Sequence, residues 1–361
     1  MIFDILKLFA KLFLVITVLV TVFLYFLAII VLGPTLFYFT PEGLNASTHN
    51  FPVLPVWFLN KRVSIPISFD VGVMFLFLWI VFAVSFVAAW KLRENFHSVI
   101  RESVTKPTRK LFSSCLFALP IINSMTLIAV MAINSIQEAG GIPTGTPPIQ
   151  GEAFLDLFEL SYSAVVEEIG FRLIPIGAFL IIYLLITKKK EVTFSFKQKI
   201  KLFFTAILFP DKAKRMSGAK TVSEYGVRGG ISLGEWGMVI FTSIVFGLAH
   251  FDPGFSWEIG KISSAAVAGL VIGLSYLVYG AQAPIIMHWF FNVYIDTFSL
   301  FSELYPPVLP FANTVLALAL VLGILGLLAA ATLGTLKLIR VIEKRGNRQN
   351  QATSSLPISP G

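Results

Sequence analysis

Residues 163–185 read SAVVEEIGFRLIPIGAFLIIYLL, a segment too apolar for an ordinary soluble helix. Three ionisable side chains interrupt it: Glu167, Glu168 and Arg172. A charged side chain at membrane depth costs at least about 2.5–3.5 kcal/mol, so such groups usually have a function. The segment therefore predicts a membrane helix, and its three charges indicate where chemistry is to be sought.

The rest of the chain has the composition of a polytopic membrane protein. Of its 361 residues, 56% are hydrophobic and 13% are charged, whereas a soluble protein has roughly 25% charged residues. A membrane helix needs about 20 apolar residues. Eight segments are expected to span the bilayer: 12–32, 69–90, 111–137, 153–186, 234–250, 262–281, 284–300 and 311–336. We therefore predict an all-α fold with about eight transmembrane helices in a single membrane domain, residues 1–346.

Basic residues fall on one side of these predicted spans. Of the 28 lysines and arginines, 24 lie in segments on one side, three lie on the other, and Arg172 lies within a span. The positive-inside rule places the basic side in the cytoplasm, and with it both termini and the long loop 188–229. The net charge of +8 then reflects topology and attraction to anionic lipid headgroups, and it does not indicate nucleic-acid binding.

The segments outside the spans also carry predictions. An external loop is expected over residues 33–68, opened by helix-breaking glycines and prolines. Within the basic loop, residues 197–209 are expected to form an interfacial helix, and the polar residues 211–220 are expected to be mobile. The tail 347–361 lacks the apolar surface needed for packing and is predicted to be disordered. The one cysteine, Cys115, excludes an intramolecular disulfide.

The two glutamates are expected to have different roles. Successive residues of a helix are about 100° apart, so Glu167 and Glu168 cannot face the same way. Glu168 and Arg172 stand at i and i+4 with the acid first, which is the favourable order for an ion pair. Glu167 is then left without a local partner, which suits a general base. From this segment alone, catalysis and a purely structural charge cluster remain equally open.

Two histidines and an asparagine in later spans favour catalysis. His250 ends one predicted span, and His288 precedes Asn292 by four residues, so that both lie on one helix face. A lone membrane histidine is more often a hydrogen-bonded core residue. Here one free carboxylate, two imidazoles and a carboxamide occur together. These are the parts of a hydrolytic site, in which a base activates water and fixed donors stabilise the oxyanion.

These segments resemble the CPBP family of intramembrane endopeptidases, which includes the type II CAAX-prenyl proteases. That family is marked by EExxxR, FxxxH and HxxxN/D motifs on separate membrane helices. The corresponding segments of this chain are Glu167–Arg172, Phe246–His250 and His288–Asn292, in that order, within a motif core of residues 160–295. Each motif is weak alone, and the three together are a specific signal.

Carried over to this chain, the resemblance implies a role for each motif residue. Glu167 and His250 would activate the water, and His288 and Asn292 would stabilise the oxyanion. The remaining motif residues would support the site: Glu168, Arg172 and Phe246. The implied substrates are membrane-associated peptides, with prenylated CAAX tails as the best-known class, from which cleavage removes the last three residues. The protein would be a multi-pass enzyme of the cell membrane or endoplasmic reticulum, depending on the host.

Other chemistries at these residues remain to be weighed. Glu167, His250 and His288 could together bind zinc, but no HExxH pair supplies two imidazoles on one helix face. We therefore favour a metal-free mechanism without a cofactor. A GxSxG match at residues 230–234 would offer Ser232 as a nucleophile. At the polar edge of a span, this serine is expected to be a helix cap instead.

Two functions outside proteolysis also remain open. One is a non-catalytic scaffold or immunity-type protein of the same fold, against which the intact motifs count. The other is a transporter that uses Glu167, Arg172 and the histidines as a proton or ion relay. Against a transporter, the chain shows no pair of Gly/Pro-broken helices in inverted halves.

The depth of the site is a problem for the predicted spans. The predicted spans place Glu167, His250 and His288 at different depths in the membrane, so some of the predicted span boundaries must be wrong. The turn 280–284, GAQAP, is expected to lie inside the protein, where irregular backbone lines a cavity. The spans do not decide to which side the site opens, and the resemblance implies the cytoplasmic side.

Overall fold

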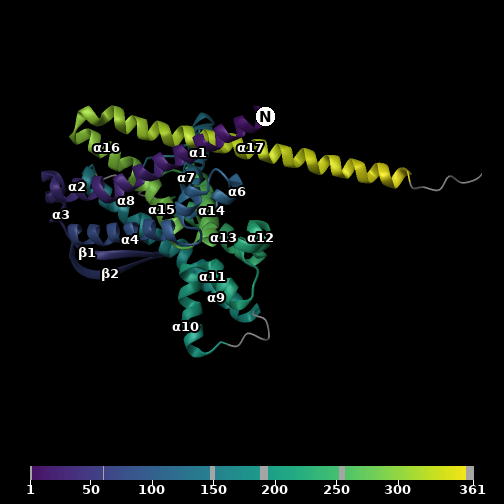
Figure 1. Ribbon diagram of the computed structural model, residues 1–361. Helices are drawn as coiled ribbons and strands as arrows, with labels where there is room; N and C mark the ends of the chain where they lie inside the picture. Colours follow the sequence, from purple (N-terminus) through teal and green to yellow (C-terminus); the bar gives the residue numbers. More distant parts are fainter. Residues whose placement is uncertain (1, 60, 147–150, 188–193, 252–256, 355–361) are drawn as a thin grey trace, which may run out of the picture.

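The computed structural model describes residues 2–59, 61–146, 151–187, 194–251 and 257–354 (Figure 1). Within these residues, six helical segments are long and apolar enough to cross a membrane: Ile5–Phe39, Val71–Lys91, Cys115–Ala139, Ala153–Thr187, Lys261–Tyr279 and Pro306–Arg340. A seventh span is possible if the helices Val222–Gly230 and Leu233–Ala249, which meet at a 69° bend, count as one. The prediction of an all-α polytopic membrane protein is confirmed. The number eight is not, because the predicted span 284–300 is not among these segments.

The described elements follow one another along the chain. In the first part they are α1 (Ile2–Phe26), η1 (Leu27–Leu32), α2 (Gly33–Phe39), α3 (Pro41–Ser47), β1 (Asn50–Phe58), β2 (Lys61–Asp70), α4 (Val71–Lys91), α5 (Phe96–Arg101), α6 (Thr108–Leu111) and α7 (Cys115–Ala139). In the second part they are α8 (Ala153–Glu168), η2 (Ile169–Leu173), α9 (Ile174–Thr187), α10 (Phe196–Leu208), α11 (Pro210–Ser217), α12 (Val222–Gly230), α13 (Leu233–Ala249), α14 (Lys261–Tyr279), α15 (Gln282–Trp289), η3 (Phe290–Tyr294), α16 (Ile295–Leu304), η4 (Pro306–Val308) and α17 (Leu309–Ser354). Three of these, η1, η2 and η3, are π-helical turns inside longer helices.

The first helix continues beyond the point where the sequence predicts a loop. Gly33 and Pro34 begin α2 without a break, because Leu32 and Gly33 both keep helical backbone angles and α1, η1 and α2 form one continuous segment. Gly33 has a packing role, since a Cβ atom there would lie 1.8 Å from the ring of Trp79. The Trp79 indole N–H donates to the carbonyl of Ile29. The prediction that residues 33–39 form part of a loop is therefore wrong.

A β-hairpin follows, which the sequence did not predict. Strands β1 and β2 pair antiparallel from Asn50–Asp70 to Phe58–Lys61. The hairpin packs along α8, where the Tyr162 hydroxyl donates to the carbonyl of Pro55. Figure 1 shows it running beside the helices towards the middle of the bundle. The hairpin thus packs against the helix that carries the two glutamates.

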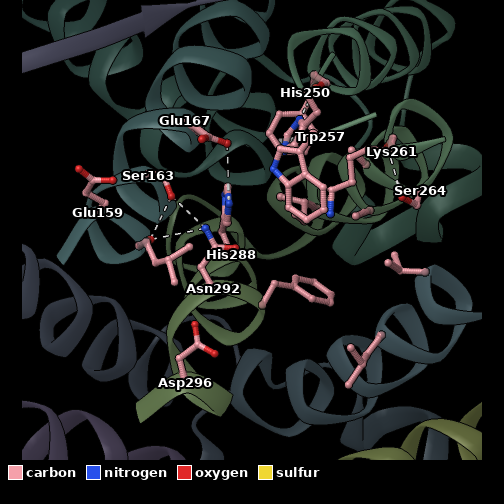
Figure 2. A pocket seen from close by; sticks show the side chains of 18 of the residues that line it. Glu159, Ser163, Glu167, His250, Trp257, Lys261, Ser264, His288, Asn292 and Asp296 are labelled. Atoms are coloured by element: carbon pink, nitrogen blue, oxygen red, sulfur yellow. Dashed lines mark hydrogen bonds and ion pairs between the residues drawn. The ribbon is translucent and has the colours of Figure 1, made fainter. Parts of the chain in front are cut away.

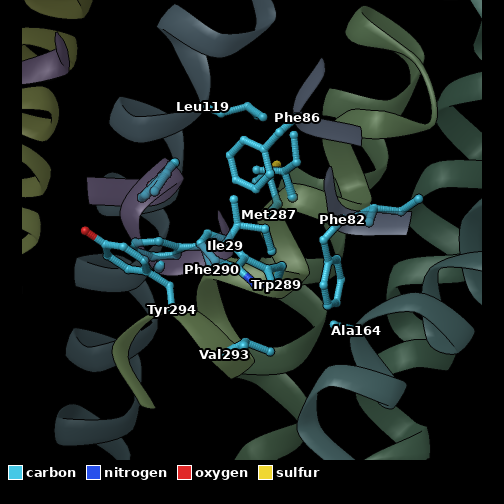
Figure 3. Close-up of a cluster of buried hydrophobic side chains, with 14 of the residues drawn as sticks. Ile29, Phe82, Phe86, Leu119, Ala164, Met287, Trp289, Phe290, Val293 and Tyr294 are labelled. Carbon is cyan, nitrogen blue, oxygen red and sulfur yellow. The ribbon is translucent and has the colours of Figure 1, made fainter. Parts of the chain in front are cut away.

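An aromatic cluster fixes the helix that carries His288. Trp289 packs edge-on against Tyr25 and Phe86, with ring centroids 5.6 and 5.1 Å apart. Tyr294, one turn further, contacts Tyr25 at 4.7 Å. Figure 3 shows Phe86, Trp289 and Tyr294 within this cluster of buried side chains. Because Trp289 is held in the core, its neighbour His288 is turned to another side of the helix.

The basic segments meet at one end of the bundle. The start of α1 and the end of α17 lie at this end (Figure 1). Lys11 donates to the carbonyl of Val104 at 2.9 Å, which ties the first helix to the loop 92–114. Arg93 of that loop donates to the carbonyl of Val278, at the end of α14. The described ends of α1 and α17 therefore share one side, as the alternation of basic loops predicts.

The long basic loop is largely helical where it is described. The helix predicted over residues 197–209 is present as α10 (Phe196–Leu208), which begins with a capping box of Ser195 and Gln198, and its interfacial position stays a prediction. The prediction that residues 211–220 are mobile is wrong, because α11 is anchored by Lys214, whose ammonium lies 2.5 Å from the Glu235 carboxylate in a fully buried pair. Residues 188–193 of the loop lie outside the described residues.

The C-terminal helix is longer than the sequence indicated. Helix α17 continues to Ser354, into the tail 347–361 for which disorder is predicted. Residues 355–361 lie outside the described residues, so the prediction stands only for them. Helix α17 thus runs without a break from the predicted domain, residues 1–346, into the predicted tail.

Candidate active site

The two glutamates separate as their helical spacing predicts. Glu168 is fully buried and forms an ion pair with Arg172, at 2.9 Å between Oε1 and Nη1. The side chain of Glu167 is 21% exposed and lines a cavity. The predicted pair of Glu168 with Arg172 is confirmed.

Glu168 has a second partner that the sequence did not reveal. The same oxygen, Oε1, lies 2.7 Å from Nδ1 of His288. This carboxylate therefore joins Arg172 on its own helix to an imidazole 120 residues further along the chain. Since the ionised carboxylate can only accept, Nδ1 carries a proton that it donates to Glu168.

The other ring nitrogen of His288 faces Glu167. Its Nε2 lies 3.8 Å from Oε2 of Glu167, beyond a direct hydrogen bond. Among the described residues, Oε2 of Glu167 has no hydrogen-bond partner. A water molecule that makes bonds of about 2.8 Å can contact both atoms at once across this separation.

Asn292 lies next to His288 on the same helix face. Its Nδ2 donates to the hydroxyl of Ser163 at 2.9 Å and approaches the carbonyl of Leu160 at 3.5 Å. Ser163 precedes Glu167 by four residues and therefore lies on the same face of α8. Figure 2 shows Ser163 and Asn292 beside the contact of Glu167 with His288. The serine holds the carboxamide in place, a role that only the i+4 spacing before Glu167 could have suggested.

His250 ends α13 on the other side of the cavity. Its Nδ1 lies 2.8 Å from the carbonyl of Phe246, one turn earlier. Because a carbonyl oxygen only accepts, Nδ1 is the protonated nitrogen and Nε2 keeps its lone pair. A neutral imidazole of this tautomer can accept a hydrogen bond from water.

Phe246 lies at the centre of the motif residues. Its ring covers the Arg172 guanidinium at 3.9 Å, a cation–π contact. The ring also packs edge-on against His250 at 4.6 Å and against His288 at 6.0 Å. One aromatic side chain therefore positions both imidazoles and shields the buried arginine, whose Nε and Nη2 have no hydrogen-bond partner among the described residues.

The four residues predicted to be catalytic line one cavity of about 490 Å³ (Figure 2). Its described lining comprises Leu127, Val130, Asp156, Glu159, Leu160, Ser163, Glu167, Phe246, His250, Trp257, Lys261, Ser264, Ala265, Ala268, Ile272, His288, Phe291, Asn292 and Asp296. Figure 2 places His250, Trp257 and Lys261 across the cavity from Glu167 and His288. The sequence analysis did not assign Trp257 and Lys261 to the site, because no local spacing connects them to the motifs. The same holds for the three other carboxylates of the lining, Asp156, Glu159 and Asp296.

Two features of the backbone resolve the conflict of depths. Helix α15, which carries His288, begins inside the protein, since all of its residues from Gln282 to Trp289 are buried. The turn before it is tied to the end of α10 by a bond from the Ala281 N–H to the Leu208 carbonyl, at 2.9 Å. The prediction that this turn lies within the protein agrees with that burial. His288 can therefore lie near the start of its helix and still at the depth of Glu167.

Two π-helical turns lie at the motifs. Turn η2 begins directly after Glu168, and η3 includes Asn292. Such turns insert an extra residue into a helix and are frequent at functional sites. A Cβ atom on Gly170, within η2, would lie 2.0 Å from the carbonyl oxygen of Trp57 at the end of β1. The glycine of the first motif is thus required where the hairpin meets this turn.

The described side chains do not form a metal site. No group of three or more His, Cys, Asp and Glu residues among them is arranged to hold a metal ion. The preference for a metal-free mechanism over zinc at Glu167, His250 and His288 stays a prediction. The serine alternative is weakened, because Ser232 caps α13 and accepts from the N–H of Glu235 in a capping box.

The helices bring a carboxylate, two imidazoles and a carboxamide into one cavity, and the class that they define is a polytopic membrane protein with a cavity lined by acid–base side chains. A protein-family model described as type II CAAX prenyl endopeptidase Rce1-like matches residues 151–294. The match covers all three motifs and confirms the resemblance to the CPBP family. At the level of the family, it supports a CAAX-type intramembrane protease, which is an integral multi-pass membrane protein. No curated protein and no solved structure matches the chain.

Proposed function

We propose that this protein is an intramembrane endopeptidase that cleaves membrane-associated peptides with a water molecule activated by Glu167. The observation that carries the proposal is that Glu167 lines the cavity and that its Oε2, which lies 3.8 Å from His288 Nε2, has no hydrogen-bond partner among the described residues. A water between these atoms would be polarised from two sides. His250, which lines the same cavity with a free Nε2, would accept its second hydrogen and orient it.

The reaction then follows from the donors and acceptors of the site. Glu167 takes a proton from the water as the oxygen attacks the peptide carbonyl, and later passes that proton to the leaving amine. The negative charge moves to the former carbonyl oxygen. Doubly protonated His288 donates Nε2–H to this oxyanion, and Asn292 donates from Nδ2. Glu168, held by Arg172, stabilises the positive charge on His288.

We further propose prenylated CAAX-type tails as the substrate class to test first. The support is the family match over residues 151–294, and the apolar part of the cavity lining, which includes Leu127, Ile272 and Phe291 and suits a lipidated peptide. The convergence of Glu167, Phe246, His250, His288 and Asn292 on one cavity favours an enzyme over a scaffold, which needs no such arrangement. A relay for protons or ions would predict flux through liposomes that carry the protein, and we expect none.

The test compares cleavage of a quenched prenylated CAAX peptide by the purified protein and its variants. Glu167→Gln is expected to lower kcat by about 10²–10⁴-fold, the usual contribution of a general base. Glu102→Gln serves as the control, because Glu102 pairs with Lys106 in the basic loop far from the cavity. Full activity of Glu167→Gln would exclude the proposed mechanism. Activity that persists with 1,10-phenanthroline is expected, and inhibition by this chelator would restore the zinc alternative.

A further inference from the structure

A second cavity, of about 480 Å³, lies at the basic end of the bundle. Its lining comes from the ends of two membrane helices and from the long basic loop: Leu92, Arg93, Phe209, Asp211, Lys212, Arg215, Met216, Ser223, Val278, Tyr279 and Gly280. None of these residues lines the candidate active site. The cavity therefore needs an explanation of its own.

The lining carries more positive than negative charge. Three cationic side chains, Arg93, Lys212 and Arg215, face one carboxylate. That carboxylate, Asp211, accepts from the N–H groups of Val222 and Ser223 and thereby caps α12. A capping carboxylate is already satisfied by backbone donors, so it neutralises the three cations only in part.

The other contacts of the cations leave donors available. Arg215 donates Nη2–H to the Ser223 hydroxyl at 2.8 Å and lies 3.9 Å from the carboxylate of Glu224. Both members of this pair are more than half exposed, so the pair is weak. A guanidinium has five N–H donors, which suits further bonds to phosphate oxygens.

Arg93 is held in an unusual conformation at the cavity wall. Its φ angle is +66°, in the left-handed region that residues other than glycine rarely adopt. Its guanidinium lies over the ring of Tyr279 at 5.2 Å and donates to the carbonyl of Val278. Backbone strain of this kind persists where the surrounding structure requires it, often at ligand sites.

The remaining wall is apolar and lies at the membrane surface. Leu92 directly follows α4, and Val278 and Tyr279 end α14, so the cavity is at the level where two membrane helices leave the bilayer. The neighbouring α10 exposes apolar side chains, among them Phe203 and Phe204, next to its lysines. Such a helix lies in the headgroup region. The cavity thus combines cations with an apolar wall at headgroup depth.

We propose that this cavity binds the phosphate headgroup of an anionic phospholipid. Arg93, Lys212 and Arg215 contact the phosphate oxygens, and the apolar wall of Leu92, Phe209 and Met216 contacts the upper acyl chain. Basic pockets between membrane helices on the cytoplasmic side are suited to such headgroups. A soluble phosphate compound shares the headgroup chemistry but does not use the apolar wall, so the lipid is the occupant that the whole lining fits.

The test measures lipid selectivity of the full-length protein. Native mass spectrometry counts bound phosphatidylglycerol and phosphatidylcholine after exchange from mixed micelles. The double variant Lys212→Gln/Arg215→Gln is compared with Lys199→Gln/Lys201→Gln, which removes the same charge from exposed lysines of α10 outside the cavity lining. The cavity variant is expected to lose about tenfold or more of its preference for phosphatidylglycerol. The control is expected to keep it within about twofold, since Lys199 and Lys201 do not line the cavity and exposed charges are screened by salt.

The possible results separate a site from general electrostatics. An equal loss in both double variants would overturn the proposal, because the basic end would then attract anionic lipid without a defined cavity. Complete displacement of phosphatidylglycerol by inorganic phosphate would also overturn it, in favour of a site for small anions. Unchanged thermal unfolding of the cavity variant in phosphatidylcholine checks that the loss is not caused by misfolding.

Discussion

At the scale of single residues, neighbouring carboxylates on one helix differ in what they contact. Glu167 meets the cavity, whereas Glu168 meets Arg172 and His288 at 2.9 and 2.7 Å. Glu168 is therefore more than the structural partner that its i+4 spacing indicated. It fixes the ring orientation of His288 and, with it, the nitrogen that points towards Glu167. Oε1 of Glu168, in the first motif, thus contacts His288 of the third motif directly.

This difference predicts that Glu168→Gln and Glu167→Gln both lower activity but differ in their effect on thermal stability. Glu168→Gln leaves the fully buried Arg172 without a counter-charge, and breaking such a pair costs about 3–5 kcal/mol. We expect a large loss of thermal stability together with loss of activity. Glu167→Gln removes no ion pair closer than 3.8 Å, so it is expected to lose activity while unfolding near the wild-type temperature. Thermal unfolding in detergent, measured beside peptide cleavage, checks this, and equal destabilisation by both variants would contradict it.

The contact of Ser163 with Asn292 predicts a graded series. Removing an oxyanion donor lowers kcat by about 10²–10³-fold, which is the expected result for Asn292→Ala. Ser163→Ala retains the donor but not the 2.9 Å contact that positions it, so kcat is expected to fall by less and KM to stay constant. Ser163→Thr keeps the hydroxyl and is expected to restore most of the activity. A rise in KM alone for Ser163→Ala would mean that Ser163 binds substrate instead.

At the scale of secondary-structure elements, the end of the hairpin contacts the helical segment that carries Glu167 at Gly170. The Leu59 N–H donates to the carbonyl of Gly170 at 3.3 Å, directly beside the two glutamates. Trp57 and Leu59 also pack against the cluster formed by Phe171, Phe246 and Ala265. The end of the hairpin and the first two motifs are thus one packed unit. Movement of the hairpin would be transmitted to Glu167.

Gly170→Ala is predicted to separate this unit. The added Cβ would lie 2.0 Å from a backbone oxygen of Trp57, which cannot rotate away. Overpacking of this kind costs typically about 1–3 kcal/mol, and the activity is expected to fall with the stability. Gly237→Ala is the matched control, because a Cβ atom on this residue of α13 meets nothing within 4 Å. Equal behaviour of the two variants in unfolding and cleavage would show that the hairpin does not position the site.

The sequence predicted those elements whose signal is local. The pair of Glu168 with Arg172 depends on i+4 spacing, and the cap at Ser232 depends on a residue three positions later, so both could be predicted. The hairpin was not predicted, although residues 63–69, VSIPISF, alternate apolar residues with serine or proline, because the prolines of residues 50–70 are unfavourable in paired strands. The π-helical turns have no local signature. Contacts such as Glu168 with His288 depend on packing between distant helices, which spacing along the chain does not encode.

At the scale of the whole molecule, the candidate active site lies away from the basic end. Helix α13 starts next to the basic loop and ends at His250, and α14 starts at Lys261 and returns to Tyr279 beside Arg93. Leu127 lies 12 residues into α7, about 18 Å from the basic end at 1.5 Å per residue. The cavity therefore occupies the half of the bundle opposite the basic segments.

Combined with the positive-inside rule, this position predicts access from the non-cytoplasmic side. Cys115 is the one cysteine of the chain. After its replacement by Ser, single cysteines can be placed at chosen sites. A membrane-impermeant maleimide applied to intact cells is expected to label Lys261→Cys, at the cavity, but not Lys212→Cys, at the basic end. Permeabilised cells are expected to show labelling of both, which controls for reactivity.

The labelling result decides where the substrate must be presented. Labelling of Lys261→Cys from outside means that peptides enter from the non-cytoplasmic face, and a cytoplasmic CAAX tail would then have to enter the bilayer to reach Glu167. The reverse pattern would mean that the 24 basic residues of one side do not set the orientation. It would place the cavity on the cytoplasmic side, where the family resemblance puts it. Because cleavage by purified protein in detergent does not depend on orientation, the peptide assay and the labelling assay can fail independently of each other.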